Sequence, residues 1–239
     1  MQTAIIIAVA AFAAVVSGVT GFGYGVVSMS ILPLFLGLRV LNPAITVLSC
    51  GNSLYILAAG WRRVRWRTLL PLLAGAAIGI PLGVFMLARM DERIARRILG
   101  IVIAAYVVYD LLPLPKPRRG LSALWGAAFG LLSGALGGAF AMGGPPVVVY
   151  FSLRGLGKEE MRPSLSAYFV LTYVYKIPLL FLGGFFTAEV GRTVLLMALP
   201  TLAGVIAGQY MASRITNRVF QWALIGLLAV TAVIYLTGK

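Results

Sequence analysis

The stretch Ser17-Gly-Val-Thr-Gly-Phe-Gly-Tyr-Gly25 decides the fold, since it ends one long apolar run and precedes a short one over residues 26–38. A second glycine-rich stretch, Gly134-Ala-Leu-Gly-Gly-Ala-Phe-Ala-Met-Gly-Gly-Pro-Pro146, precedes another short run over residues 145–153. Glycine weakens a helix by about 1 kcal/mol relative to Ala, and broken backbone at membrane depth needs protein or a wet cavity around it. Both stretches are therefore predicted to interrupt helices inside a bundle.

The composition around these stretches is too apolar for a soluble protein. Of 239 residues, 61% are hydrophobic and 11% are charged, whereas a soluble domain carries roughly 25% charged residues. The apolar excess must face lipid, so we expect an all-α, polytopic transmembrane helical bundle. Ten segments are predicted, over residues 3–18, 26–38, 43–60, 68–88, 94–112, 121–136, 145–153, 163–183, 190–211 and 219–237.

Charged and reactive residues exclude most enzyme classes. The formal charge is +14, but the basic residues stand in short runs between apolar segments, which is typical of topology signals and not of nucleic-acid binding. The chain has no His and a single Cys, Cys50, so His-based catalysis, disulfides and Cys/His metal sites are excluded. Among the carboxylates only Asp110 falls inside an apolar run. We therefore expect no enzyme activity, no metal and no cofactor.

The chain repeats itself once. The repeated landmarks are Ser17-Gly18-x2-Gly21 with Ser133-Gly134-x2-Gly137, Pro43 with Pro163, and Gly79-x3-Gly83 with Gly204-x3-Gly208. We predict a first transmembrane repeat over 1–112, a basic, Pro-rich cytoplasmic linker over 113–119 and a second repeat over 120–239. The glycines at helical spacing, Gly79 and Gly83 among them, are expected to serve close helix packing.

The repeats are predicted to be inverted. The loop over 61–67 carries Arg62, Arg63, Arg65 and Arg67, whereas its second-half equivalent near residues 184–191 carries only Glu189. Opposite sides for equivalent loops explain this asymmetry through the positive-inside rule. The loops over 61–67, 154–162 and 214–218 and the linker are then cytoplasmic, although the arginines over 89–97 fall on the other side.

The two breaks also predict a binding site for an anion. Each is followed by a short helix whose N-terminus carries unpaired N–H groups and a partial positive charge. Pro145 and Pro146 suit the first turn of such a helix. The alternative is that small residues only allow close packing. We favour discontinuous helices, some of them re-entrant, that point at a midplane substrate.

Two polar residues inside apolar segments complete the predicted site. Lys176 has no acidic residue in its own segment, so an anionic substrate is expected to neutralise it; the alternative is a Lys that snorkels to an interface. Aligning Pro43 with Pro163 pairs Asn52 with Thr172 and predicts that Asn52 faces the 172–176 region. A plain interhelical hydrogen bond is the alternative for Asn52.

The candidate substrate-binding residues are Thr20, Gly21, Phe22, Gly23, Tyr24, Gly25, Asn52, Gly137, Gly138, Met142, Gly143, Gly144, Pro145, Tyr173 and Lys176. The predicted activity is secondary transport of a small anion by alternating access, and the predicted partners are that anion and the lipid bilayer. A homodimer stays open, as does the direction of transport. A passive anion channel and a membrane subunit without transport of its own are the alternatives.

The two glycine-rich stretches, the duplication and the basic linker resemble the sulfite exporter TauE/SafE family, also called the 4-toluene sulfonate uptake permease family. The resemblance covers nearly the whole chain. It implies a bacterial inner-membrane permease, often an exporter, for a sulfur-containing anion such as sulfite, sulfoacetate or another organosulfonate. Ala139 and Ala141 stand where the family usually has glycine.

Overall fold

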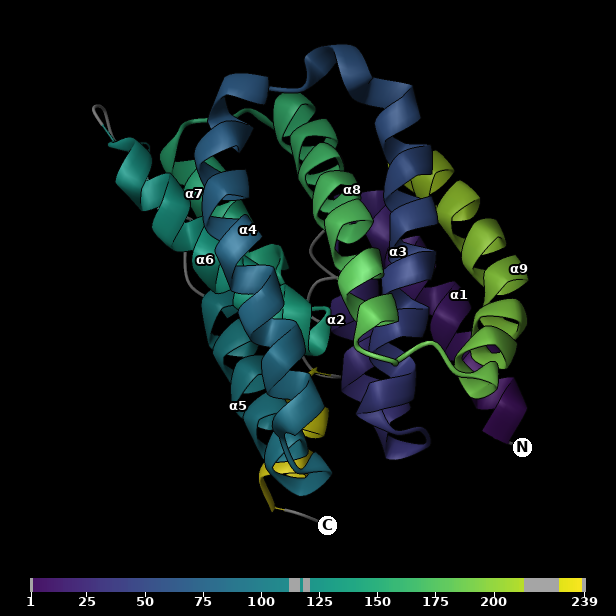
Figure 1. The fold of residues 1–239 in the computed structure, drawn as a ribbon. Helices are drawn as coiled ribbons and strands as arrows, with labels where there is room; N and C mark the ends of the chain where they lie inside the picture. Colours follow the sequence, from purple (N-terminus) through teal and green to yellow (C-terminus); the bar gives the residue numbers. More distant parts are fainter. Residues whose placement is uncertain (1, 112–116, 118–120, 213–227, 238–239) are drawn as a thin grey trace.

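The computed structural model describes residues 2–111, 117, 121–212 and 228–237, and every described element is helical (Figure 1). The elements are α1 (Gln2–Thr20), α2 (Tyr24–Ile31), η1 (Leu32–Leu34), α3 (Leu38–Gly60), η2 (Trp61–Arg63), α4 (Trp66–Arg89), α5 (Glu92–Leu111), α6 (Ala123–Phe140), α7 (Gly144–Leu153), α8 (Lys158–Leu182), α9 (Ala188–Met211) and a further helix, Leu228–Thr237. The all-α prediction is confirmed. The predicted linker, Pro117 apart, and the loop over 214–218 lie outside the described residues.

Six of the described helices are long and apolar enough to cross a membrane: α1, α3 with η2, α4, α6, α8 and α9. The apolar helices that follow the two glycine-rich stretches are shorter, at 8 residues for α2 and 10 for α7. At 1.5 Å per residue neither reaches across a bilayer core of about 30 Å. The chain is therefore a multi-pass membrane protein with two short helices, as its apolar pattern predicts. The predicted segment over 94–112 forms α5, which is not among the six.

Glycines bring two pairs of helices into backbone contact. A Cβ added at Gly208 of α9 would lie 3.0 Å from the Cα of Gly18 on α1. A Cβ added at Gly79 of α4 would lie 2.9 Å from the backbone nitrogen of Ala135 on α6. Any side chain at these positions would force the helices apart, so the packing role predicted for the glycine spacing is confirmed.

At each glycine-rich stretch the long helix and the short helix after it form a hairpin. After the first break the chain returns along α1, since Gln2 at the start of α1 donates from Nε2 to the carbonyl of Phe35, 3.1 Å away. After the second break α7 returns along α6, because a Cβ added at Gly126 would meet the Tyr150 side chain at 2.8 Å. The long helix and the short one therefore lie side by side and not end to end.

Two loops meet at one end of the bundle, the end occupied by η2 and the beginning of α8 (Figure 1). Arg63 pairs with Glu159 at 3.3 Å and Arg65 with Glu160 at 2.6 Å. The hydrogen bond to Glu160 raises the pKa of the Arg65 guanidinium above its ordinary value. The loops around 61–67 and 154–162 therefore share a face, as the charge pattern predicts.

Candidate functional site

Both glycine-rich stretches interrupt a helix, as predicted. The first break lies between Thr20 and Tyr24, and Gly21 and Gly23 adopt φ values of 85° and 101°, in the left-handed region that favours glycine. The second break lies between Phe140 and Gly144, where Ala141 holds φ at 53°. A backbone that reverses direction in this way cannot continue as one helix.

The two breaks touch each other at the centre of the bundle. A Cβ added at Gly25 would overlap the carbonyl oxygen of Ala141 and lie 3.1 Å from its carbonyl carbon. A Cβ added at Gly144 would lie 2.7 Å from the Phe22 ring. Only glycine at these two positions lets the start of each short helix approach the other break, so segments far apart in sequence form one structural unit.

A cavity of about 20 Å³ lies between the two breaks. Eight of the residues predicted to bind substrate line it, namely Phe22, Gly23, Tyr24, Gly25, Met142, Gly143, Gly144 and Tyr173. The rest of its wall comes from Ser17, Val26, Ser49, Ser53, Ala141 and Phe169. The volume suffices for about one water molecule, so this conformation is closed around the site.

The N-terminus of α2 supplies most of the backbone donors at this cavity. The first amide of α2 that bonds within the helix is that of Val27, which donates to the Gly23 carbonyl at 3.0 Å. The amides of Tyr24, Gly25 and Val26 therefore have no acceptor within α2. At α7 the prolines at 145 and 146 carry no N–H. The first break is accordingly the richer source of donors, although both helix starts carry partial positive charge.

Lys176 lies inside the bundle, with 1% of its surface exposed. Its Nζ donates to the carbonyl of Gly137 at 2.7 Å and to Oγ1 of Thr46 at 2.9 Å. The snorkelling alternative is therefore wrong. The ammonium instead lies near the C-terminal end of α6, where the helix carries partial negative charge.

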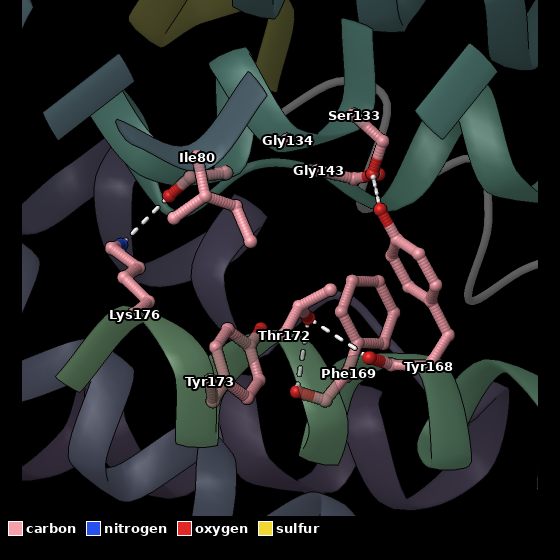
Figure 2. A pocket seen from close by; sticks show the side chains of 10 residues that line it. Ile80, Ser133, Gly134, Gly143, Tyr168, Phe169, Thr172, Tyr173 and Lys176 are labelled. Atoms are coloured by element: carbon pink, nitrogen blue, oxygen red, sulfur yellow. Dashed lines mark hydrogen bonds between the residues drawn. The ribbon is translucent and has the colours of Figure 1, made fainter. Parts of the chain in front are cut away.

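Lys176 lines a second cavity of about 20 Å³, next to the first. The two cavities share Gly143, Phe169 and Tyr173. Figure 2 shows Lys176 and Tyr168 reaching from α8 toward α6 at opposite ends of this second cavity, where the Tyr168 hydroxyl donates to Ser133 Oγ at 2.9 Å. Charge, hydroxyls and aromatic rings from α6 and α8 thus surround one space.

Asn52 is buried without a hydrogen bond. Its side chain is 3% exposed, and neither amide atom has a partner among the described residues. The plain interhelical hydrogen bond is therefore wrong, and Lys176 reaches Thr46 on α3 rather than Asn52. A buried, unsatisfied amide destabilises the folded protein by about 1–3 kcal/mol, so Asn52 does not serve the stability of this conformation.

The remaining predicted residues lie beside the cavities. The Thr20 hydroxyl closes the first break, donating to the Val16 carbonyl at 2.9 Å. Gly21 packs against Arg162, and the Gly138 carbonyl accepts from Asn42 at 3.0 Å. Pro145 lines a separate, apolar cavity between α5, α6 and α7. These four positions shape the breaks from outside.

Several residues at the site were not predicted from the sequence. They are Asn42, Thr46, Ser133, Arg162, Tyr168 and Phe169. A usable signal did exist for Asn42 and Arg162, because each directly precedes one of the two aligned prolines, Pro43 and Pro163. Among the described residues no three His, Cys, Asp or Glu side chains gather in a way that could hold a metal ion.

The sequence is similar to that of one protein family and of two named transport proteins. The sequence profile of the family described as Sulfite exporter TauE/SafE matches residues 6–235. The chain is 28% identical over 166 residues to a protein of Cupriavidus necator named probable sulfite/organosulfonate exporter TauE, covering 64% of this chain and 62% of that relative. It is 28% identical over 169 residues to the probable inner membrane transporter protein TsaS of Comamonas testosteroni, covering 70% and 71%. The match therefore spans less than two thirds of the Cupriavidus protein. No solved structure matches the chain.

Proposed function

Because the chain belongs to the sulfite exporter TauE/SafE family of membrane transporters, we propose that it moves a small sulfur-containing anion across a bacterial inner membrane by alternating access. Sulfite, sulfoacetate and other organosulfonates are the candidate substrates, and export is the proposed direction. The family consists of transporters, not enzymes. The substrates named for the Cupriavidus relative are sulfur oxyanions, which agrees with a site built from helix N-termini and a lysine.

One observation carries this proposal: both breaks line the same cavity, and the start of α2 faces it with amides that have no acceptor in the helix. Helix N-termini bind anions through such amides and through the helix dipole. Lys176 adds a full charge in the adjoining cavity. Buried donors of this kind favour an oxyanion over a neutral solute.

Packing supports two inverted repeats. Under the proposed repeat, α6 corresponds to α1 and α9 corresponds to α4. The pair α1 and α9 then corresponds to the pair α6 and α4. The two helices of each pair lie side by side (Figure 1), and glycines stand at both contacts. Each half begins with a long helix and a returning short one, which supports a re-entrant path for α2 and α7. A midplane site between such repeats is typical of secondary transporters.

The closed cavities favour a carrier over a channel. Each holds about one water molecule, which is less than any sulfur oxyanion occupies, so the helices around the breaks must move before substrate can pass. A channel needs a continuous path in its conducting state.

The homodimer stays a prediction.

Purified protein in proteoliposomes loaded with radiolabelled sulfite tests the function. The wild type is expected to release sulfite, and Lys176→Ala is expected to lose most of this efflux because the site loses its full charge. Leu171→Ala, a change at an exposed position of the same helix, serves as the control and is expected to behave like the wild type. Efflux of no sulfite or sulfonate by the wild type would overturn the proposal, and ion conductance at rates beyond those of a carrier would establish the channel alternative.

A further inference from the structure

Besides the two cavities at the breaks, a polar cavity, called the third cavity below, opens at the end of the bundle that carries the loops around 61–67 and 154–162, with a volume of about 200 Å³. Gly60 of α3, Arg162 of α8 and Gln209 of α9 line it, with the exposed Arg63–Glu159 pair at its rim. It is roughly ten times larger than either cavity at the breaks. A small oxyanion fits here in the present conformation.

Arg162 connects this third cavity to the first break. Its Nη2 donates to the carbonyl of Gly18 near the end of α1, and its side chain packs against Gly21, whose added Cβ would lie 2.6 Å from the Arg162 Cγ. Its Nε is buried and has no hydrogen-bond partner among the described residues. A guanidinium presents five donors in a fixed fork, so this one retains capacity for a further acceptor.

At the second break, a neutral side chain makes the contact that corresponds to the one between Arg162 and the end of α1. Asn42, which precedes Pro43 as Arg162 precedes Pro163, donates from Nδ2 to the carbonyls of Gly138 and Ala139 at 3.0 and 2.7 Å near the end of α6. A neutral amide is thus sufficient to satisfy carbonyls at the end of a broken helix. The charge at Arg162 needs a separate explanation.

Access distinguishes Arg162 from the other donors at the helix ends. Asn42 is 0% exposed and Lys176 is 1% exposed, whereas Arg162 is only partly buried and lines the third cavity. An anion that arrives from this end of the bundle meets Arg162 first. Lys176 lies beyond the first break, behind closed cavities.

We propose that the third cavity is the first binding station for the transported oxyanion and that Arg162 is the residue that binds it. This inference rests on the function proposed above. The –SO3 group shared by sulfite and sulfonates presents several oxygens, which suits a two-point contact with Nε and a terminal nitrogen of the guanidinium once the side chain turns its buried Nε toward the cavity. An anion bound there competes with the Gly18 carbonyl for Arg162, so its arrival loosens the contact that holds the end of α1 against α8.

Three variants separate this role from a purely structural one. Arg162→Gln keeps an N–H donor for the Gly18 carbonyl but removes the charge, Arg162→Lys keeps the charge, and Arg67→Gln removes an exposed charge from the same end of the molecule. Sulfite efflux from proteoliposomes gives KM and kcat, and sulfite-dependent thermal stabilisation of the purified protein reports binding without transport.

We expect Arg162→Gln to raise the KM for sulfite about tenfold, the loss that follows from one charge-assisted hydrogen bond, and to reduce the thermal stabilisation by sulfite. Arg162→Lys keeps the charge but loses the planar fork that a two-point contact needs, so its KM should rise about threefold, and Arg67→Gln should match the wild type. Wild-type KM and wild-type stabilisation in Arg162→Gln would overturn the inference and leave the function intact. If Arg162→Gln does not fold, a KM about threefold higher in Arg162→Lys than in Arg67→Gln supports the inference, and equal values overturn it.

Discussion

Gly25→Ala is the sharpest perturbation of the contact between the two breaks. The added Cβ would overlap the Ala141 carbonyl oxygen and lie 3.1 Å from its carbonyl carbon. Both atoms belong to backbone, so neither can rotate away as a flexible side chain does. Gly25 holds no positive φ, which means that the substitution tests steric contact alone and not backbone strain.

The expected cost follows from overpacking. An extra methyl group in a well-packed interior costs about 1–3 kcal/mol, and the start of α2 must move away from the second break to accept it. The cavity between the breaks then changes shape, so sulfite efflux should fall together with stability. A chain of 150–250 residues loses about 2–4 °C in Tm per kcal/mol, and Gly25→Ala should therefore unfold several degrees below the wild type.

Gly51→Ala is the matched control, because a Cβ added there would meet no described atom within 4 Å apart from its chain neighbours and the backbone of its own helix. Alanine is favoured over glycine inside a helix by about 0.5–1 kcal/mol, so this variant should be as stable as the wild type or slightly more so. Thermal unfolding in detergent and efflux from proteoliposomes measure both properties for each variant. Equal Tm and equal efflux for Gly25→Ala and Gly51→Ala would refute the direct contact between the breaks.

Two further predictions concern burial and orientation. Asn52→Leu should raise Tm, because it removes a buried amide whose unsatisfied hydrogen bonds cost about 1–3 kcal/mol. It should also slow sulfite efflux if the amide contacts the anion during transport. A lower Tm would show that Asn52 has a hydrogen-bond partner in the folded protein. The predicted orientation places residue 67 on the cytoplasmic side and residue 192 on the opposite side. In a Cys50→Ala background, Arg67→Cys should therefore react with a membrane-impermeant maleimide only in inside-out vesicles, and Arg192→Cys only in right-side-out vesicles. The reverse pattern would show that the proposed orientation is inverted.

The breaks could be predicted from the sequence because they depend on local physics. Dense glycine next to an apolar run too short to cross a bilayer leaves the backbone few alternatives, and the spacing of Gly79 and Gly83 leaves one helix face without side chains. These features need no knowledge of which helices become neighbours. Their positions and their roles in packing agree with the structure.

The partners of the buried polar side chains depend on tertiary placement and could not be predicted. Lys176 reaches the Gly137 carbonyl only because the fold places this part of α8 opposite the C-terminal part of α6. The sequence pattern places Arg162 in a basic loop, since the predicted segment begins at residue 163, whereas α8 begins at Lys158 and carries Arg162 inside the helix. Pro145 suits a helix start, but it offers no N–H to a ligand.

The arrangement of the donors explains how a cavity enclosed by broken helices can favour an anion. Each break joins the C-terminal end of one helix, with its unpaired carbonyls and partial negative charge, to the N-terminal end of another. Left alone, the carbonyls at the ends of α1 and α6 would repel the ligand that the starts of α2 and α7 attract. Arg162 donates to the first of these ends, and Asn42 and Lys176 donate to the second. These donors offset part of the negative charge at the helix ends, whereas the amides of Tyr24 and its neighbours have no acceptor within α2, and the difference favours an anion at the breaks. The side chains that donate to the helix ends therefore favour a negatively charged substrate even without contacting it.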